Sequence, residues 1–194
     1  QDDMGGTMRW IPQLPGLGEW ARIVNYRKIQ IDKLKNVEFI PNMKLSAKDV
    51  AEYGAEIVIV ATGSYWSTDG LNGASHATIT GADASLAWQA TPDQIMGEGK
   101  QLQGDNVVIF DNDGYFMGVS LAEKLAEEGK KVTLMTPMGH VASYMHFTLE
   151  APNQHRILHR LGVEIVTYHM PTKFEEGRVL ASHVYDEHGH EHEF

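Results

Sequence analysis

Apolar residues recur along the first third of the chain at two spacings, which predict helices and strands in alternation. Helical spacing over Glu19–Lys35 predicts an amphipathic helix, and a capping pattern at Ser46–Asp49 predicts a second helix that ends at Gly54. Short apolar runs predict strands at Val37–Ile40 and Glu56–Ala61. The second run is continuous, which is typical of a strand buried on both faces of a parallel sheet.

The rest of the chain begins with an irregular stretch, residues 64–90, and then becomes regular. Thr91-Pro92-Asp93-Gln94 predicts a helix start with Thr91 as N-cap, Pro92 at the first helical position and Gln94 closing the capping box. Residues 106–136 then read as strand, turn, helix and strand, with Gly129 ending the helix.

The pattern after this unit predicts a helix over Phe147–Leu161 closed by Gly162, a strand over Val163–Tyr168, and a β-hairpin or meander over residues 178–194. Strands that alternate with helices indicate the α/β class. We therefore expect a Rossmann-like FAD/NAD(P)-binding fold, with a mostly parallel sheet and a β-hairpin or meander.

The turn of the predicted strand–turn–helix unit reads DNDGYFMG, Asp111–Gly118. A dinucleotide loop uses glycines in a G-x-G-x-x-G pattern so that backbone amides approach the pyrophosphate. Alignment on Gly118 places Asp113 and Tyr115 at the first two glycine positions, whereas alignment on the strand end places Asp111 and Asp113 there. In either alignment a side chain blocks the close approach of the backbone to the ligand. The carboxylates also repel phosphate, by about 3 kcal/mol each at ~5 Å and an effective dielectric of ~20.

The end of the following strand provides a second test of cofactor binding. Strand KKVTLMT runs into Pro137, so Thr136 and its neighbours offer neither a carboxylate for ribose hydroxyls nor an arginine for a 2′-phosphate. The turn is therefore predicted to be a retained scaffold with an empty nucleotide site.

Composition narrows the function classes. The 194 residues are 42% hydrophobic and carry a net charge of −10, which disfavours nucleic acid and an anionic membrane surface as partners. No apolar run approaches the ~20 residues of a membrane span, and no secretory signal pattern is present. Because there are no cysteines, the chain has no disulfide, no thiol nucleophile and no thiolate ligand for an iron–sulfur cluster. A cytoplasmic setting is compatible with this composition. Both ends resemble cuts within a longer protein, so we expect a fragment.

Ten histidines are present, and His188, His190 and His192 form an H-x-H-x-H pattern. Alternate residues of a strand share a face, so these three could hold zinc or nickel. An exposed, solvated hairpin edge explains the pattern better, so no metal site and no catalytic residue is assigned.

Five sequence segments, in this order, resemble the C-terminal nucleotide-domain region of trimethylamine dehydrogenase and its relatives, the dimethylamine and histamine dehydrogenases. They are LPGLGEW (Leu14–Trp20), VIVATG (Val58–Gly63), TGADASL (Thr80–Leu86), DGYFMGVSLAEKLA (Asp113–Ala126) and YMHFTLEAPN (Tyr144–Asn153).

The resemblance implies two parts: a partial first nucleotide domain over residues 1–80 that lacks its glycine loop, and a second, NAD(P)-like domain over residues 81–194. It implies that Gly5, Gly6, Ala61, Thr62 and Gly63 line an adenine-nucleotide pocket for ADP or FAD. The parent enzyme would carry FMN and a [4Fe–4S] cluster, oxidise a small amine and pass electrons to an electron-transfer flavoprotein. A homodimer is left open, and the isolated fragment is expected to be inactive.

Two other functions remain open at this point. One is an NAD(P)H-dependent flavin oxidoreductase of the dienoyl-CoA reductase type, which would require an intact glycine loop and a ribose-binding residue. The other is a non-enzymatic α/β binding module.

Overall fold

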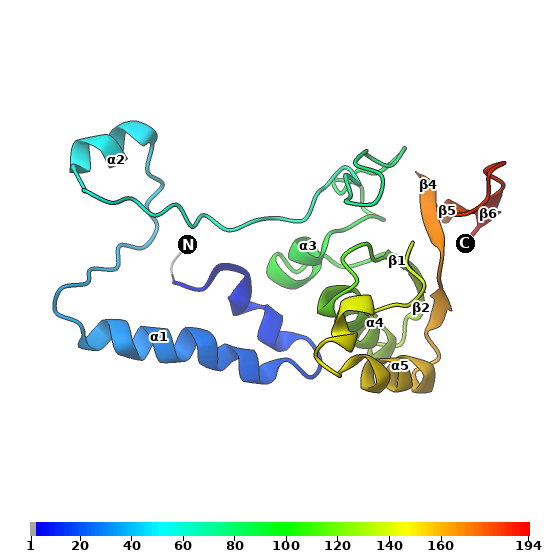
Figure 1. Ribbon diagram of the computed structural model, residues 1–194, viewed down its shortest axis with the longest axis horizontal. Helices are drawn as coiled ribbons and strands as arrows, with labels where there is room; N and C mark the ends of the chain where they lie inside the picture. The colour runs from blue at the N-terminus through cyan, green and yellow to red at the C-terminus, as the bar shows by residue number, and fades with distance from the viewer. Residues whose placement is uncertain (1–2) are drawn as a thin grey trace. The chain divides into compact units, whose positions relative to one another are not determined.

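The computed structural model describes residues 3–194, and the chain divides into two units at Tyr65/Trp66. Figure 1 shows the succession of their elements. Among the described residues, no helix is long and apolar enough to cross a membrane.

The first unit consists of short helices joined by extended chain. Three 3-10 helices, η1 (Gly6–Arg9), η2 (Ile11–Gln13) and η3 (Gly18–Trp20), precede α1 (Ala21–Lys33) and α2 (Ala47–Tyr53). The expected capping box at the start of α2 is confirmed, because Ser46 and Asp49 exchange side-chain and backbone hydrogen bonds. Gly54 ends this helix in the left-handed region, at φ +72°.

Both strands predicted in the first unit are wrong. Val37–Ile40 and Glu56–Ala61 lie in extended loops, and residues 3–65 contain no strand. The side chains of Ile57, Ile59 and Val60 are 81%, 85% and 80% exposed. A strand needs a neighbour to satisfy its backbone groups and bury its side chains, and the described part of this unit supplies none.

The second unit is built on the predicted strand–helix–strand unit, which is confirmed. Strand β1 (Asn106–Phe110) leads into α4 (Phe116–Glu127) and β2 (Lys131–Met135), and helix α5 (Ala151–Arg160) then leads into β3 (Glu164–Val166). These strands form a parallel sheet in the order β1-β2-β3. Helix α4 packs on the strands and contacts α5 (Figure 1). The core of this layer includes Val119, Leu134 and Leu158, all fully buried.

Helix ends in the second unit follow local sequence signals, with one exception. Thr91 caps α3 (Pro92–Gly97) through the expected capping box with Gln94. Gly129 and Gly162 follow α4 and α5 with φ of +89° and +72°, as predicted. The helix expected over Phe147–Leu161 instead begins at Ala151, after the 3-10 helix η4 (Ser143–His146), because Pro152 suits the first turn of a helix rather than its interior.

A second sheet completes this unit, so the expected parallel sheet is accompanied by an antiparallel sheet of its own. Strands β4 (His169–Glu175), β5 (Arg178–His183) and β6 (Glu191–Glu193) form an antiparallel meander of three strands, equal in number to the parallel ones. The hairpin predicted over residues 178–194 is confirmed as β5 and β6, whereas β4 was not anticipated. The fold is α/β with one parallel and one antiparallel sheet.

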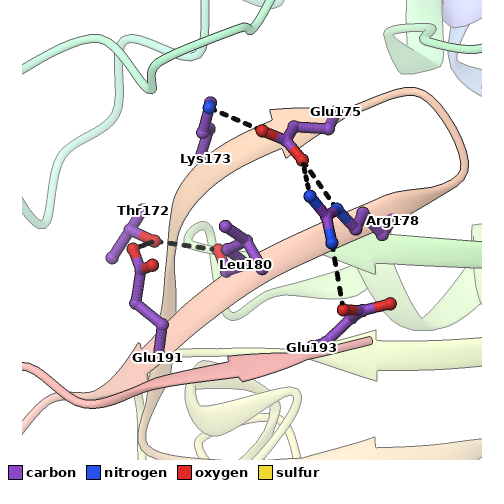
Figure 2. Close-up of polar contacts among 7 residues, drawn as sticks. All are labelled: Thr172, Lys173, Glu175, Arg178, Leu180, Glu191 and Glu193. Carbon is purple, nitrogen blue, oxygen red and sulfur yellow. Dashed lines mark hydrogen bonds and ion pairs between the residues drawn. The ribbon is translucent and has the colours of Figure 1, made fainter.

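Polar side chains connect the short strand β6 to strands β4 and β5. Figure 2 shows Arg178 between Glu175 and Glu193, at nitrogen–oxygen distances of 2.5 and 3.3 Å. Thr172 donates to Glu191 (2.5 Å). Hydrogen bonds from Lys173 and Arg178 lower the pKa of Glu175. Because these groups are solvent-accessible, the ion pairs add little to stability.

Candidate functional site: the turn between β1 and α4

The turn of residues 111–115 lies at the carboxyl end of β1, the edge at which open α/β sheets bind ligands. Asp111 extends the strand by one residue, because its backbone N–H donates to the Met135 carbonyl at 2.8 Å. The chain then turns through Gly114, at φ +65°, and enters α4 at Phe116.

The Asp111 side chain is folded into the turn. Its Oδ1 accepts hydrogen bonds from the backbone N–H groups of Asp113 and Gly114, each at 3.0 Å. The residue is only 4% exposed, and its Oδ2 has no hydrogen-bond partner in the described structure. Desolvation, reinforced by the charge of Asp113, raises the pKa of Asp111 to about 6, against the opposing effect of the two backbone hydrogen bonds.

The first turn of α4 accommodates this carboxylate because residue 118 is glycine. A Cβ on Gly118 would lie 2.5 Å from Cγ and 2.7 Å from Oδ2 of Asp111. Of the two alignments considered from sequence, the geometry favours the one that ends on Gly118, since this residue allows close packing of helix on strand. The carboxylate of Asp111 therefore lies against the N-terminal turn of the helix.

The loop after β2 packs onto the same turn. A Cβ on Gly114 would lie 2.6 Å from Sδ of Met138, and the Tyr144 N–H donates to the Gly114 carbonyl at 2.9 Å. Thr136, at the position of a ribose-binding residue, is fully buried, and its Oγ1 accepts from the Met138 N–H (3.3 Å). The loop after β2 thus packs against one side of the turn.

A cleft of about 1200 Å³ extends from this turn along β1 within the second unit. Its walls are mostly apolar and include Trp88, Phe110, Met117 and Phe174, while Asp111 and Asp113 lie among its polar lining residues. Its volume exceeds the range of about 300–1,000 Å³ that is typical of small-molecule sites.

The five residues predicted to line an adenine-nucleotide pocket belong to the first unit. Gly5 and Gly6 have φ of +120° and +52°, and Gly63 has φ +80°. Gly5 borders a small apolar cavity of about 260 Å³, with Val24 and Ile31. Ala61, Thr62 and Gly63 are exposed and lie outside this cavity's lining. Their proposed role stays a prediction.

The histidines of the H-x-H-x-H pattern do not share one strand face. His188 and His190 lie in the turn before β6, where Asp186 bonds the ring and backbone of His190. His192 instead approaches His169 of β4, at 5.7 Å between ring centroids, and His169 lies 5.2 Å from His183 of β5. Among residues 3–194, no group of three or more His, Cys, Asp or Glu side chains could hold a metal ion.

Sequence reasoning missed both the inward orientation of Asp111 and the cross-strand histidines. Gly118, seven residues after Asp111, was the available signal for the first feature. The second required the β4–β5 register, which pairs His169 with His183.

Comparisons with known proteins give a consistent result. Residues 90–194 match the model of a family described as the OYE-like second alpha/beta domain. Dimethylamine dehydrogenase from Hyphomicrobium sp. (strain x) is 40% identical over 192 residues, which cover 96% of this chain and 26% of that protein. A probable N-methylproline demethylase from Rhizobium meliloti (strain 1021) is 31% identical, with coverage of 96% and 26%.

Solved structures of related proteins resemble this chain in backbone fold as well as in sequence. Histamine dehydrogenase from Rhizobium sp. 4-9 matches 98% of this chain and 29% of its own, with 37% identity and a TM-score of 0.87. The 6-hydroxypseudooxynicotine amine oxidase from Pseudomonas geniculata N1 matches 100% and 28%, with 33% identity and a TM-score of 0.89. The chain spans about a quarter of the length of the curated relatives it matches.

Proposed function

Because the chain belongs to the family of OYE-like second alpha/beta domains, in the trimethylamine dehydrogenase-like group, we propose that it is the nucleotide-domain region of an amine dehydrogenase. The parent protein would oxidise a small amine, by N-demethylation or deamination, and pass the electrons to an electron-transfer flavoprotein. The observation that carries this proposal is the 40% identity to dimethylamine dehydrogenase over nearly the whole chain.

The catalytic cofactors would be bound outside this region. The parent's FMN would accept electrons from the amine, and a [4Fe–4S] cluster would relay them. This chain contains no cysteine, so its residues do not fit a cluster that is held by thiolates. We assign no catalytic residue here, and a cytoplasmic location of the parent remains part of the proposal.

The region's own role would be structural and nucleotide-binding. We propose that the first unit is part of an adenine-nucleotide domain, in which Gly5, Gly6 and Ala61–Gly63 lie along ADP or FAD. The second unit would be a Rossmann-like domain whose dinucleotide loop has lost its ligand. Its buried Asp111 and the packing of Met138 near Gly114 support this interpretation.

The test is steady-state turnover of the full-length protein. Dimethylamine, trimethylamine and histamine are offered separately with a redox dye as acceptor, and electron-transfer flavoprotein then replaces the dye. We expect amine-dependent reduction of both acceptors and no turnover by the 194-residue chain alone.

The dienoyl-CoA reductase type is the alternative that this assay separates. NADPH-driven reduction of an unsaturated acyl thioester, without any amine oxidation, would contradict the proposal.

A further inference from the structure

We infer that the side chain of Asp111 closes an otherwise intact anion-binding turn: its carboxyl group occupies the position at the start of α4 that a ligand phosphate would take. This inference goes beyond the proposed function, because it identifies the group that closes the site.

The turn has the donors that an anion site needs. Backbone N–H groups of Asp113 and Gly114 converge on one point, and Oδ1 of Asp111 accepts from both at 3.0 Å. Successive backbone amides in a turn form anion-binding concavities of this kind. Helix α4 begins two residues later and runs for 12 residues, so its N-terminus adds a favourable partial positive charge.

Burial of the carboxylate is the independent observation that indicates occupancy. Asp111 is 4% exposed, and its Oδ2 lies without a hydrogen-bond partner in the described structure, against the backbone of Gly118. A solvent-facing aspartate would exclude phosphate only by repulsion at a distance. Asp111 instead fills the space at the start of α4 with its own carboxyl group, which fits there because Gly118 has no side chain.

Asp113 has a different part in this arrangement. Its backbone N–H belongs to the donor pair, but its side chain is exposed. Replacing that side chain removes a negative charge from the rim while leaving Asp111 in place. Occupancy and simple repulsion can therefore be separated by comparing the two positions.

The experiment measures binding of inorganic pyrophosphate by calorimetric titration to variants of this chain. Wild type and Asp113→Ala should show no saturable binding, because Asp111 still fills the turn. Asp111→Gly in the Asp113→Ala background should show saturable binding of pyrophosphate, since two backbone donors are released to a charged acceptor. Asp111→Asn in the same background retains a side-chain acceptor of equal size and should remain closed.

Two results would overturn the inference. One is binding by Asp113→Ala as tight as that of the Asp111→Gly double variant, which would make repulsion the cause. The other is a folded double variant, shown by a cooperative melt, that binds no pyrophosphate.

Hydrogen exchange of the wild type gives a readout that needs no variant to fold. The amides of Asp113 and Gly114 should be protected from exchange, whereas exchange at unstructured rates in folded protein would also overturn the inference. None of these measurements depends on amine turnover, so a failure here is distinct from a failure of the proposed dehydrogenase function.

Discussion

The side chain of Asp111 packs directly against Gly118. The first turn of α4 approaches the end of β1 so closely that a Cβ on Gly118 would lie 2.5 Å from Cγ of Asp111. The glycine and the buried carboxylate are therefore interdependent. Strand, turn and helix are held in their relative positions by this contact and by the two hydrogen bonds that the carboxylate accepts.

The first prediction tests this interdependence by a double-mutant cycle. Gly118→Ala should lower the free energy of unfolding by up to about 2 kcal/mol, because overpacking costs about 1–3 kcal/mol and the helix-propensity gain offsets only about 1 kcal/mol of it. In an Asp111→Gly background the same substitution should be neutral or stabilising, since the obstructing side chain is gone. Urea denaturation of the four proteins measures the coupling, and equal costs in both backgrounds would contradict the contact.

The second prediction concerns pH. Burial raises the pKa of Asp111 from 3.8 to about 6, so the folded state holds this proton more tightly than the unfolded state. The contribution of Asp111 to stability is therefore largest below pH ~4 and is lost as the pH rises through ~6. The difference between the two pKa values corresponds to a loss of roughly 3 kcal/mol in the free energy of unfolding.

Asp111→Asn should abolish that part of the pH dependence, and the difference between the two unfolding profiles isolates it from other carboxyls. Asp105→Asn is the matched control, because the Asp105 side chain is 95% exposed. If the difference between wild type and Asp111→Asn does not change from pH 4 to pH 7, the carboxyl is not buried as described.

The third prediction concerns Gly81, which lies against β4. Its φ is +77°, and a Cβ there would lie 2.1 Å from the Phe174 carbonyl oxygen. The Phe174 N–H donates to the Thr80 carbonyl at 2.8 Å, so this strand cannot move away without losing a hydrogen bond.

Gly177→Ala is the control for Gly81→Ala, because Gly177 has φ +84° and no atom within 4 Å of the added Cβ. The control should cost about 1–2 kcal/mol from its left-handed backbone alone. Gly81→Ala should cost at least about 2 kcal/mol more, through the clash. Equal unfolding free energies for the two variants would show that residues 79–81 do not pack on β4.

Local sequence signals predicted those features that local physics determines. Thr91, Gly129 and Gly162 mark helix ends by capping and left-handed backbone, and the structure confirms all three. The strand predicted from the apolar run at Glu56–Ala61 is absent, because a strand forms and is buried only beside neighbouring strands, and a continuous apolar run does not show whether they exist.

The candidate site shows the same division. The segment DNDGYFMG lacks the glycines of a dinucleotide loop, and KKVTLMT lacks a ribose-binding residue, so both differences can be seen in the sequence. The direction of the Asp111 side chain was not, because a carboxylate after a strand is normally solvated and only the packing of α4 turns it inward. The sequence predicts that side chains at the glycine positions block close approach and that their carboxylates repel phosphate, whereas the geometry distinguishes a buried Asp111 from an exposed Asp113.

The last prediction concerns the half of the nucleotide site in the first unit. If Gly5, Gly6 and Ala61–Gly63 line an adenine-nucleotide pocket, ADP should raise the melting temperature of the full-length protein. It should not raise that of the 194-residue chain, because we propose that the glycine loop that holds the pyrophosphate lies outside these residues. Loss of two or three charge-assisted hydrogen bonds, at about 1.5–3 kcal/mol each, weakens a micromolar site to millimolar or beyond.

A matched pair of substitutions in the full-length protein tests the residues themselves. Gly6 and Gly54 both have positive φ, +52° and +72°, and open space around an added Cβ. Valine at either position therefore imposes a similar backbone strain. Only Gly6→Val would place a side chain where the protein backbone is proposed to contact the nucleotide. Gly6→Val should abolish the ADP-induced shift and Gly54→Val should preserve it. Equal stabilisation of the short chain and the full-length protein by millimolar ADP would instead show that the binding groups lie elsewhere.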